Sequence, residues 1–302
     1  MKHKPFKTID EQIEVLRSKG LIIDNEEFAA HALYELNYYR LSGYTLTLRK
    51  NDIFYKGITF DDVMQIYNFD KELKVILLKY LEDIEVSLRT HIAYELGKKD
   101  IDSDCEVSYR CAENFASDRH FEDFCRDLKN AVGDNKNEAF IKHHNTKYSG
   151  VLPVWAMVET LSFGSISRLF ASLNIPLQKQ ICSEHYGGIR YTTITNWLEG
   201  LVVLRNLCAH HARLFNRGIT FVPKFSSEDI NYFVEQGYVK NQIGNRLFFR
   251  LLILERLSPL PNIHNLLVSD IKSLQSKYPF VNMSHYGFKP NWEEILSKKG
   301  TL

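Results

Sequence analysis

The sequence predicts a mainly α-helical protein, and three observations support this class. Apolar residues recur at helical spacing along most of the 302 residues, and one such run continues over residues 60–96 without a proline or glycine. Capping-box patterns precede two of the helical runs. Neither strand–helix alternation nor a repeat of roughly 20 to 50 residues is visible, which argues against a doubly wound sheet.

Helices are expected in order from the N-terminus. Thr8 and Glu11 form a capping-box pattern that begins the first helix. A second helix is predicted over about residues 26–41, and it runs into the segment LNYYRLSGY (residues 36–44), where Gly43 ends it. These helices would pack at the start of a longer one.

The longest helix is predicted over residues 60–96, after a second capping box formed by Thr59 and Asp62. At 1.5 Å per residue it would be about 55 Å long. A break near Asp70 is one option. One face carries an apolar stripe made of Ile66, Leu73, Leu77, Tyr80, Ile84, Leu88 and Ile92.

The remainder of the chain is again mostly helical in pattern. Residues 98–116 are polar and irregular, and residues 219–224 are the one convincing extended run. A helix beginning at Pro153 would contain Gly164. Further helices are expected over residues 121–132, 138–144, about 195–218, 228–235, 245–257 and 266–277.

The sequence contains no strong linker. A compositional change near Ser226 and Ser227 suggests a helical domain over residues 1–225 and a C-terminal helical region over residues 226–302. The first residues lack the apolar core of a secretory signal. The most apolar stretch, residues 247–254, is too short to cross a bilayer. We therefore expect a cytoplasmic protein with no membrane segment.

Composition limits the possible functions. Apolar residues make up 44% and charged residues 25%, both ordinary values for a soluble globular protein. Lys and Arg total 38 against 37 for Asp and Glu, so the formal net charge is +1 at pH 7. This balance excludes a surface that is basic all over. Any site for nucleic acid must therefore be local.

Such a local site is predicted in the segment WLEGLVVLRNLCAHHARLFNRG (residues 197–218). On a continuous helix, Asn206, His210, Arg213 and Arg217 would share a polar face, with Arg205 to one side and His211 at the apolar edge. No acidic residue lies between residues 200 and 227, which also contain Lys224. The opposite, apolar face would consist of Trp197, Leu201, Leu204, Cys208, Ala212 and Phe215.

These residue types suit an anion such as phosphate. Arginine offers a planar pair of donors, and a histidine that titrates near neutrality can take or give a proton. Two plainer interpretations remain open: a structural histidine, and arginines that are solvated or paired with Glu82, Glu85 or Glu159. A metal site is disfavoured because no complementary Cys or His pair accompanies Cys208 and the two histidines.

The identities of the residues in this segment indicate more than their helical spacing does. Arg205, Asn206 and His210 resemble the Arg-polar-x-x-x-His signature of HEPN ribonucleases, and the surrounding RNLCAHHARLFNR resembles the hallmark of the Abi (abortive infection) AbiD/AbiF-like family. A bare Arg-x-x-x-x-His pattern is weak, whereas an ordered set of segments is strong. The further matching segments are the first capping-box helix and residues 36–44, 67–93, 147–170 and 287–292.

The resemblance implies a HEPN-like helical bundle with long antiparallel helices and additional N- and C-terminal helices. Such proteins pair two motif-bearing helices in one composite cleft, so one motif per chain implies a homodimer. The implied activity is a metal-independent endoribonuclease without cofactors, acting as a phage-defence toxin. A small structured RNA is a plausible antitoxin.

In that activity His210 would be the general base or acid on the 2′-OH or the leaving 5′-oxygen, and Arg205 would bind the scissile phosphate. Asn206 would orient the histidine or hold a phosphate oxygen. Arg213, Arg217 and Lys224 would contact flanking phosphates of the RNA. The alternatives are a non-catalytic RNA-binding or sensor protein and a structural dimer with an ion-pair interface.

A second candidate RNA contact is the tyrosine-rich segment. Tyr38, Tyr39 and Arg40 could stack on unpaired bases. The competing interpretation, which we favour, is that the tyrosines pack the first helices onto the long helix.

Overall fold

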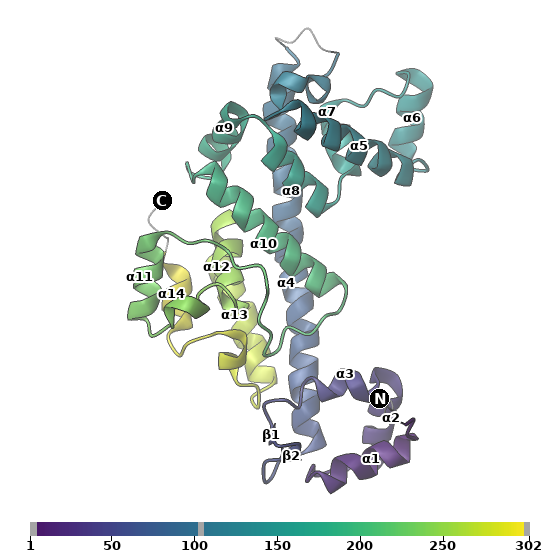
Figure 1. Ribbon diagram of the computed structural model, residues 1–302, viewed down its shortest axis with the longest axis vertical. Helices are drawn as coiled ribbons and strands as arrows, with labels where there is room; N and C mark the ends of the chain where they lie inside the picture. The colour runs from purple at the N-terminus through teal and green to yellow at the C-terminus, as the bar shows by residue number, and fades with distance from the viewer. Residues whose placement is uncertain (1–4, 102–105, 299–302) are drawn as a thin grey trace.

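The computed structural model describes residues 5–101 and 106–298, and these residues form fourteen α-helices, five short 3-10 helices and one two-stranded hairpin (Figure 1). The mainly helical class is confirmed. The α-helices are α1 (Ile9–Ser18), α2 (Glu26–Leu36), α3 (Tyr38–Ser42), α4 (Phe60–Lys99), α5 (Asp118–Asp134), α6 (Ala139–Lys147), α7 (Val154–Met157), α8 (Phe163–Ser172), α9 (Ile175–His185), α10 (Tyr191–Ala209), α11 (Ser227–Glu235), α12 (Phe248–Leu257), α13 (Ile263–Lys277) and α14 (Trp292–Ser297). The 3-10 helices are η1 (Ser108–Arg110), η2 (Ala112–Asn114), η3 (Val158–Thr160), η4 (Lys240–Gln242) and η5 (Met283–Tyr286).

The 40-residue helix α4 is the axis of the molecule. Figure 1 shows α1–α3 around its N-terminal end, α12 and α13 beside its lower half, and α5–α7 and α9 around its far end. Thr59 and Asp62 form the predicted capping box. The break considered near Asp70 does not occur, because the helix continues through it. The predicted apolar stripe is buried along its whole length.

Helix α10 lies against α4 in the antiparallel direction. Lys74 bonds to the carbonyl of Ala212, just beyond the end of α10, whereas His91 lies beside Tyr186, just before its start. Arg205 meets Glu85 between these two points. The last turn of α10 and the chain that follows it therefore face the N-terminal half of α4.

Several predicted boundaries are wrong, and local backbone geometry explains them. Residues 26–41 form two helices because Asn37, at φ 65°, turns the chain between α2 and α3 and caps α3 with its side chain. Residues 154–172 are divided into α7, η3 and α8, because Ser162 begins α8 by accepting a bond from the amide of Ser165. Helix α10 begins at Tyr191 and ends at Ala209, nine residues before the predicted end at Gly218.

The extended run predicted over residues 219–224 is irregular chain. The hairpin lies elsewhere, with β1 (Arg49–Lys50) paired antiparallel to β2 (Ile53–Phe54). Asn51 and Asp52 connect the strands with φ angles of 51° and 68°, which suits a two-residue turn. Helix α9, which sequence periodicity did not predict, begins with the cap Asn174 and a proline in its first turn.

The core continues across the predicted boundary at residues 225 and 226. Helices α12 and α13 pack on α4, and α12 also packs on α10. One cluster of buried side chains includes residues from both sides of the boundary. The division into two domains stays a prediction. Within the described residues, none of the helices combines the length and the apolar character needed to cross a membrane.

Candidate functional site

The motif helix α10 ends in a Schellman motif centred on the two histidines. The amide of His211 donates to the carbonyl of Cys208, and the amide of Ala212 donates to that of Leu207. His210 is the C-cap, and His211 has the left-handed φ of 55° that glycine usually supplies at this position. Both histidine side chains are exposed at the end of the helix.

Because α10 ends at Ala209, its predicted polar and apolar faces are partly wrong. Trp197, Leu201, Leu204 and Cys208 form the buried stripe as expected, and burial raises the pKa of the Cys208 thiol to about 12. Arg213 and Arg217 lie beyond the helix, so the predicted polar stripe of four residues does not exist. His211 is not at the edge of the core, because the left-handed turn directs it to the surface.

Arg205 faces helix α4. Its Nε lies 3.8 Å from Oε2 of Glu85, and its side chain is 37% exposed. Glu85 also binds Arg89 at 2.6 Å, which is the helix ion pair expected from their spacing. Glu85 is one of the three carboxylates predicted as partners for the arginines of residues 197–218. Asn206 is exposed beside Arg205.

The chain after α10 is held by the segment at residues 36–44, which is the second predicted RNA contact. Nη2 of Arg40 donates to the carbonyl of His211 at 2.7 Å, and Nη1 of Arg213 donates to that of Gly43 at 2.7 Å. A Cβ at Gly43 would lie 3.2 Å from the Arg213 side chain, so a glycine lets the arginine lie close to this turn. Arg40, His210, His211, Arg213 and Arg217 therefore gather at one end of α10.

The same chain is held from below by Asp70 of α4, which sequence reasoning missed as a site residue. Its buried carboxylate accepts bonds from the amides of Leu214 and Phe215, and from the hydroxyls of Tyr44 and Tyr286. Burial, reinforced by this carboxylate, raises the pKa of both tyrosines. Both hydroxyls therefore stay protonated and able to donate.

A signal for Asp70 was present in the sequence. It occupies a position of the apolar stripe, four residues after Ile66 and three before Leu73. Lys74 follows at the helical spacing that suits an ion pair, and the structure places the two charged atoms 2.8 Å apart.

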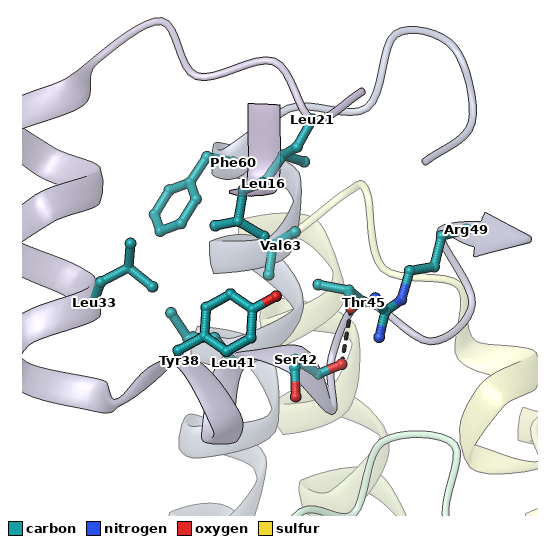
Figure 2. Close-up of a pocket in the computed structure, with 10 residues that line it drawn as sticks. All are labelled: Leu16, Leu21, Leu33, Tyr38, Leu41, Ser42, Thr45, Arg49, Phe60 and Val63. Atoms are coloured by element: carbon teal, nitrogen blue, oxygen red, sulfur yellow. Dashed lines mark hydrogen bonds between the residues drawn. The ribbon is translucent and has the colours of Figure 1, made fainter. Parts of the chain in front are cut away.

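Two of the remaining candidates lie elsewhere. The backbone of Lys224 bonds to Asn196 and Trp197 near the beginning of α10, far along the helix from His210. Figure 2 shows the ring of Tyr38 beside Leu33 and Leu41, in a pocket between the first helices and α4. The cavity there is about 10 Å³, room for about one water. The favoured packing interpretation suits Tyr38.

Tyr39 differs from its neighbour. Its side chain is 85% exposed, and it precedes Arg40, which contacts the chain after α10. It is the more exposed tyrosine of the pair, since Tyr38 is half-buried. An exposed aromatic ring with an arginine next to it is a combination suited to unpaired bases.

The site offers donors for an anion. Arginine and histidine nitrogens dominate it, and the nearest carboxylates, Asp70 and Glu85, already have cationic partners. Within residues 5–101 and 106–298, no three His, Cys, Asp or Glu side chains form a group that could hold a metal ion. The arrangement can bind a phosphate and exchange a proton with it. Within the described residues, no hydrogen bond or ion pair joins Arg205 to His210.

A family model described as Abi-like protein matches residues 31–216. The matched region contains the segment at residues 36–44, helix α4 and the whole of α10 with the chain that follows it. No curated protein and no solved structure matches the chain.

Proposed function

The chain belongs to the Abi-like protein family, and we propose from this premise that it is a metal-independent endoribonuclease of the HEPN type that acts in abortive infection. Family membership supports the role in abortive infection. The observation that carries the chemistry is the exposed end of α10, where His210 directly precedes the chain held by Arg40 and Arg213. The two carboxylates that contact this region, Asp70 and Glu85, already have cationic partners.

RNA supplies its own nucleophile. In the proposed reaction the 2′-oxygen attacks the adjacent phosphorus, a new bond from phosphorus to the 2′-oxygen forms, and the bond to the 5′-oxygen breaks. His210 takes the proton from the 2′-OH or gives one to the leaving 5′-oxygen. The products are a 2′,3′-cyclic phosphate and a 5′-OH.

Arg205 suits the phosphate because its present partner holds it loosely. A 3.8 Å contact to Glu85 on a partly exposed side chain is worth about 0–1 kcal/mol, and Glu85 binds Arg89 more closely. Replacement of Glu85 by a phosphate that accepts two hydrogen bonds from the guanidinium would be favourable. Asn206, exposed next to Arg205, would hold a phosphate oxygen or orient the histidine.

A second copy of the chain would complete the site. Arg205 is paired with Glu85 of α4, whereas His210 lies at the exposed helix end and makes no hydrogen bond or ion pair with Arg205. A two-fold pairing of the α10 ends would place the arginine of one copy near the histidine of the other. The exposed residues Tyr39, Arg40 and Arg217 would then extend the surface for single-stranded RNA.

The test is cleavage of a mixed RNA pool by the purified protein in EDTA. We expect fragments with 5′-OH and 2′,3′-cyclic phosphate ends from the wild type, and none from His210→Ala. His120→Ala, which removes an exposed histidine on α5, is the matched control and should cleave normally. RNA binding without cleavage by the wild type would instead favour the non-catalytic RNA-binding or sensor function.

A further inference from the structure

The two oxygens of Asp70 accept bonds from five donors on four parts of the chain. Oδ1 accepts from the amide of Phe215 at 2.8 Å and from the hydroxyl of Tyr286 at 3.0 Å. Oδ2 accepts from the hydroxyl of Tyr44 at 2.9 Å and from Nζ of Lys74 at 2.8 Å. The amide of Leu214 lies 3.2 Å from both oxygens. The acceptor capacity of one carboxylate is thereby filled.

The chain that follows the motif helix is anchored at every residue from 211 to 215. The carbonyls of His211 and Ala212 accept from Arg40 and from Lys74 at 2.7 and 3.3 Å. The side chain of Arg213 is bonded to Gly43, and the next two amides are bonded to Asp70. Three of these five anchors depend on Asp70 or on the lysine that it holds.

Burial strengthens the hydrogen bonds that Asp70 accepts, and an apolar residue could not replace it. Its side chain is fully buried, and that of Lys74 is 6% exposed. A charged acceptor in this setting makes stronger bonds than a neutral one, and its removal leaves buried donors without partners. No apolar residue at this position could bind two backbone amides that belong to an irregular segment.

We propose that Asp70 is a positioning residue of the site: it fixes the chain at residues 211–217 against α4 and thereby sets the place of His210, the residue immediately before it. This inference rests on the proposed function for its effect on RNA cleavage. The order of the backbone at residues 211–217 can be tested without RNA. Asp70 itself touches no reacting atom.

The experiment compares Asp70→Asn with Glu95→Gln in the full chain. Asparagine keeps the shape of the side chain, but its amide nitrogen cannot accept the bonds that the replaced oxygen accepted. Glu95 is a matched control because it too is a fully buried carboxylate on α4, bonded to Lys98, Gln180 and His185 at the other end of the helix.

The first measurement is hydrogen exchange by mass spectrometry on the native protein. We expect peptides covering residues 211–217 to exchange at least about tenfold faster in Asp70→Asn than in wild type, because their amides lose a fixed acceptor. The same peptides should be unchanged in Glu95→Gln. Unchanged exchange in folded Asp70→Asn would overturn the inference.

The second measurement is kcat for RNA cleavage per folded molecule, with the folded fraction measured by circular dichroism on the same sample. We expect kcat to fall by at least about tenfold in Asp70→Asn, since a displaced proton-transfer group loses its alignment. Glu95→Gln should keep the wild-type value. Faster exchange with a normal kcat would overturn the positioning assignment.

Two further outcomes are informative. If Asp70→Asn does not fold, the wild type is measured at single-residue resolution, because the amides of Leu214 and Phe215 lie outside any helix and bond to Asp70. Protection of both amides supports the inference, and exchange at the rate of an unprotected chain overturns it. If the wild type cleaves no RNA, the proposed function fails, whereas the exchange result still decides whether Asp70 fixes this chain.

Discussion

His210 and His211 are adjacent in sequence but differ in backbone conformation. His210 caps α10 with φ −89°, and His211 has the left-handed φ of 55°. A left-handed conformation costs an L-residue roughly 1–2 kcal/mol, although histidine tolerates it better than most side chains. The backbone of His210 therefore carries no such strain, whereas His211 forms the turn that directs the chain onto Asp70.

This difference predicts opposite effects of glycine at the two positions. His211→Gly should raise the free energy of unfolding by roughly 0.5–1 kcal/mol, because the relief of strain exceeds the added entropy of the unfolded chain. His210→Gly should lower it by roughly 0.5–1 kcal/mol. Denaturant melts of both variants measure this. A loss of stability in His211→Gly would mean that its side chain, rather than its backbone, matters to the fold.

The two arginines around Glu85 give a second comparison. Arg205→Ala should cost less than about 1 kcal/mol of stability, because its ion pair is long and partly exposed. Arg89→Ala should cost more, about 2–3 kcal/mol, because that arginine binds both Glu85 and the carbonyl of Leu161 at short distances. Cleavage of RNA should show the reverse order, with Arg205→Ala losing at least about a hundredfold in kcat.

Melting curves and cleavage rates, measured on the same samples, distinguish a structural role of Arg205 from a catalytic one. If Arg205→Ala destabilised the protein as much as Arg89→Ala, its role would be structural.

The residue types at the site were predictable from sequence, because the pattern from Arg205 to His210 is local. The role of Asp70 was not, because its partners other than Lys74 lie 26 to 216 residues away in the chain.

At the scale of elements, the main error concerned the end of α10. Ala212 and Phe215 continue the apolar spacing of the helix, so periodicity extended it to Gly218. The actual end depends on the Schellman bonds and on the acceptor that Asp70 offers to the amides of Leu214 and Phe215. Capping boxes, by contrast, are local, and those at Thr8 and Thr59 are both present as predicted.

The corrected helix end separates the two arginines that had been assigned the same role. Arg217 is exposed, and Arg213 is bonded to Gly43 at a packed turn. Arg217→Ala should lower the affinity for single-stranded RNA and make the slope of log affinity against log salt shallower by about 0.7. Arg213→Ala should instead lower the melting temperature, because it releases the contact between α3 and the chain after α10.

Fluorescence anisotropy with unstructured RNA at several salt concentrations measures the slope, and thermal melts measure the stability. An Arg217→Ala protein that binds RNA with the wild-type salt dependence would remove this arginine from the RNA surface. Arg119→Ala serves as the control, since it removes an exposed arginine on α5, around the far end of α4, and should leave the slope unchanged.

At the scale of the whole molecule, α4 connects regions that are distant in sequence. Through Asp70 it joins the N-terminal segment, the motif and the C-terminal region, because Tyr44, Phe215 and Tyr286 all reach the same carboxylate. The helical class followed from periodicity along the chain. This convergence did not, because it depends on packing between segments that no local pattern relates.

The last prediction concerns the proposed pairing of two chains. If Arg205 of one copy acts with His210 of the other, Arg205→Ala and His210→Ala are each inactive, but a mixed dimer of the two has one intact site. Random mixing makes about half of the dimers mixed, with one of two sites active, so roughly a quarter of the wild-type rate should return. Light scattering should show a dimer at micromolar concentration in every sample.

The control is a mixture of His210→Ala with Arg205→Ala/His210→Ala, in which no pairing restores a site. Subunit exchange is verified by mass spectrometry on one isotopically labelled partner, so that mixed dimers are known to be present. Mixed dimers without recovered cleavage would place both groups in the same chain, and α10 would then have to rotate Arg205 away from Glu85 to bring it toward His210. Recovery near a quarter would instead assign the arginine and the histidine of each site to different copies.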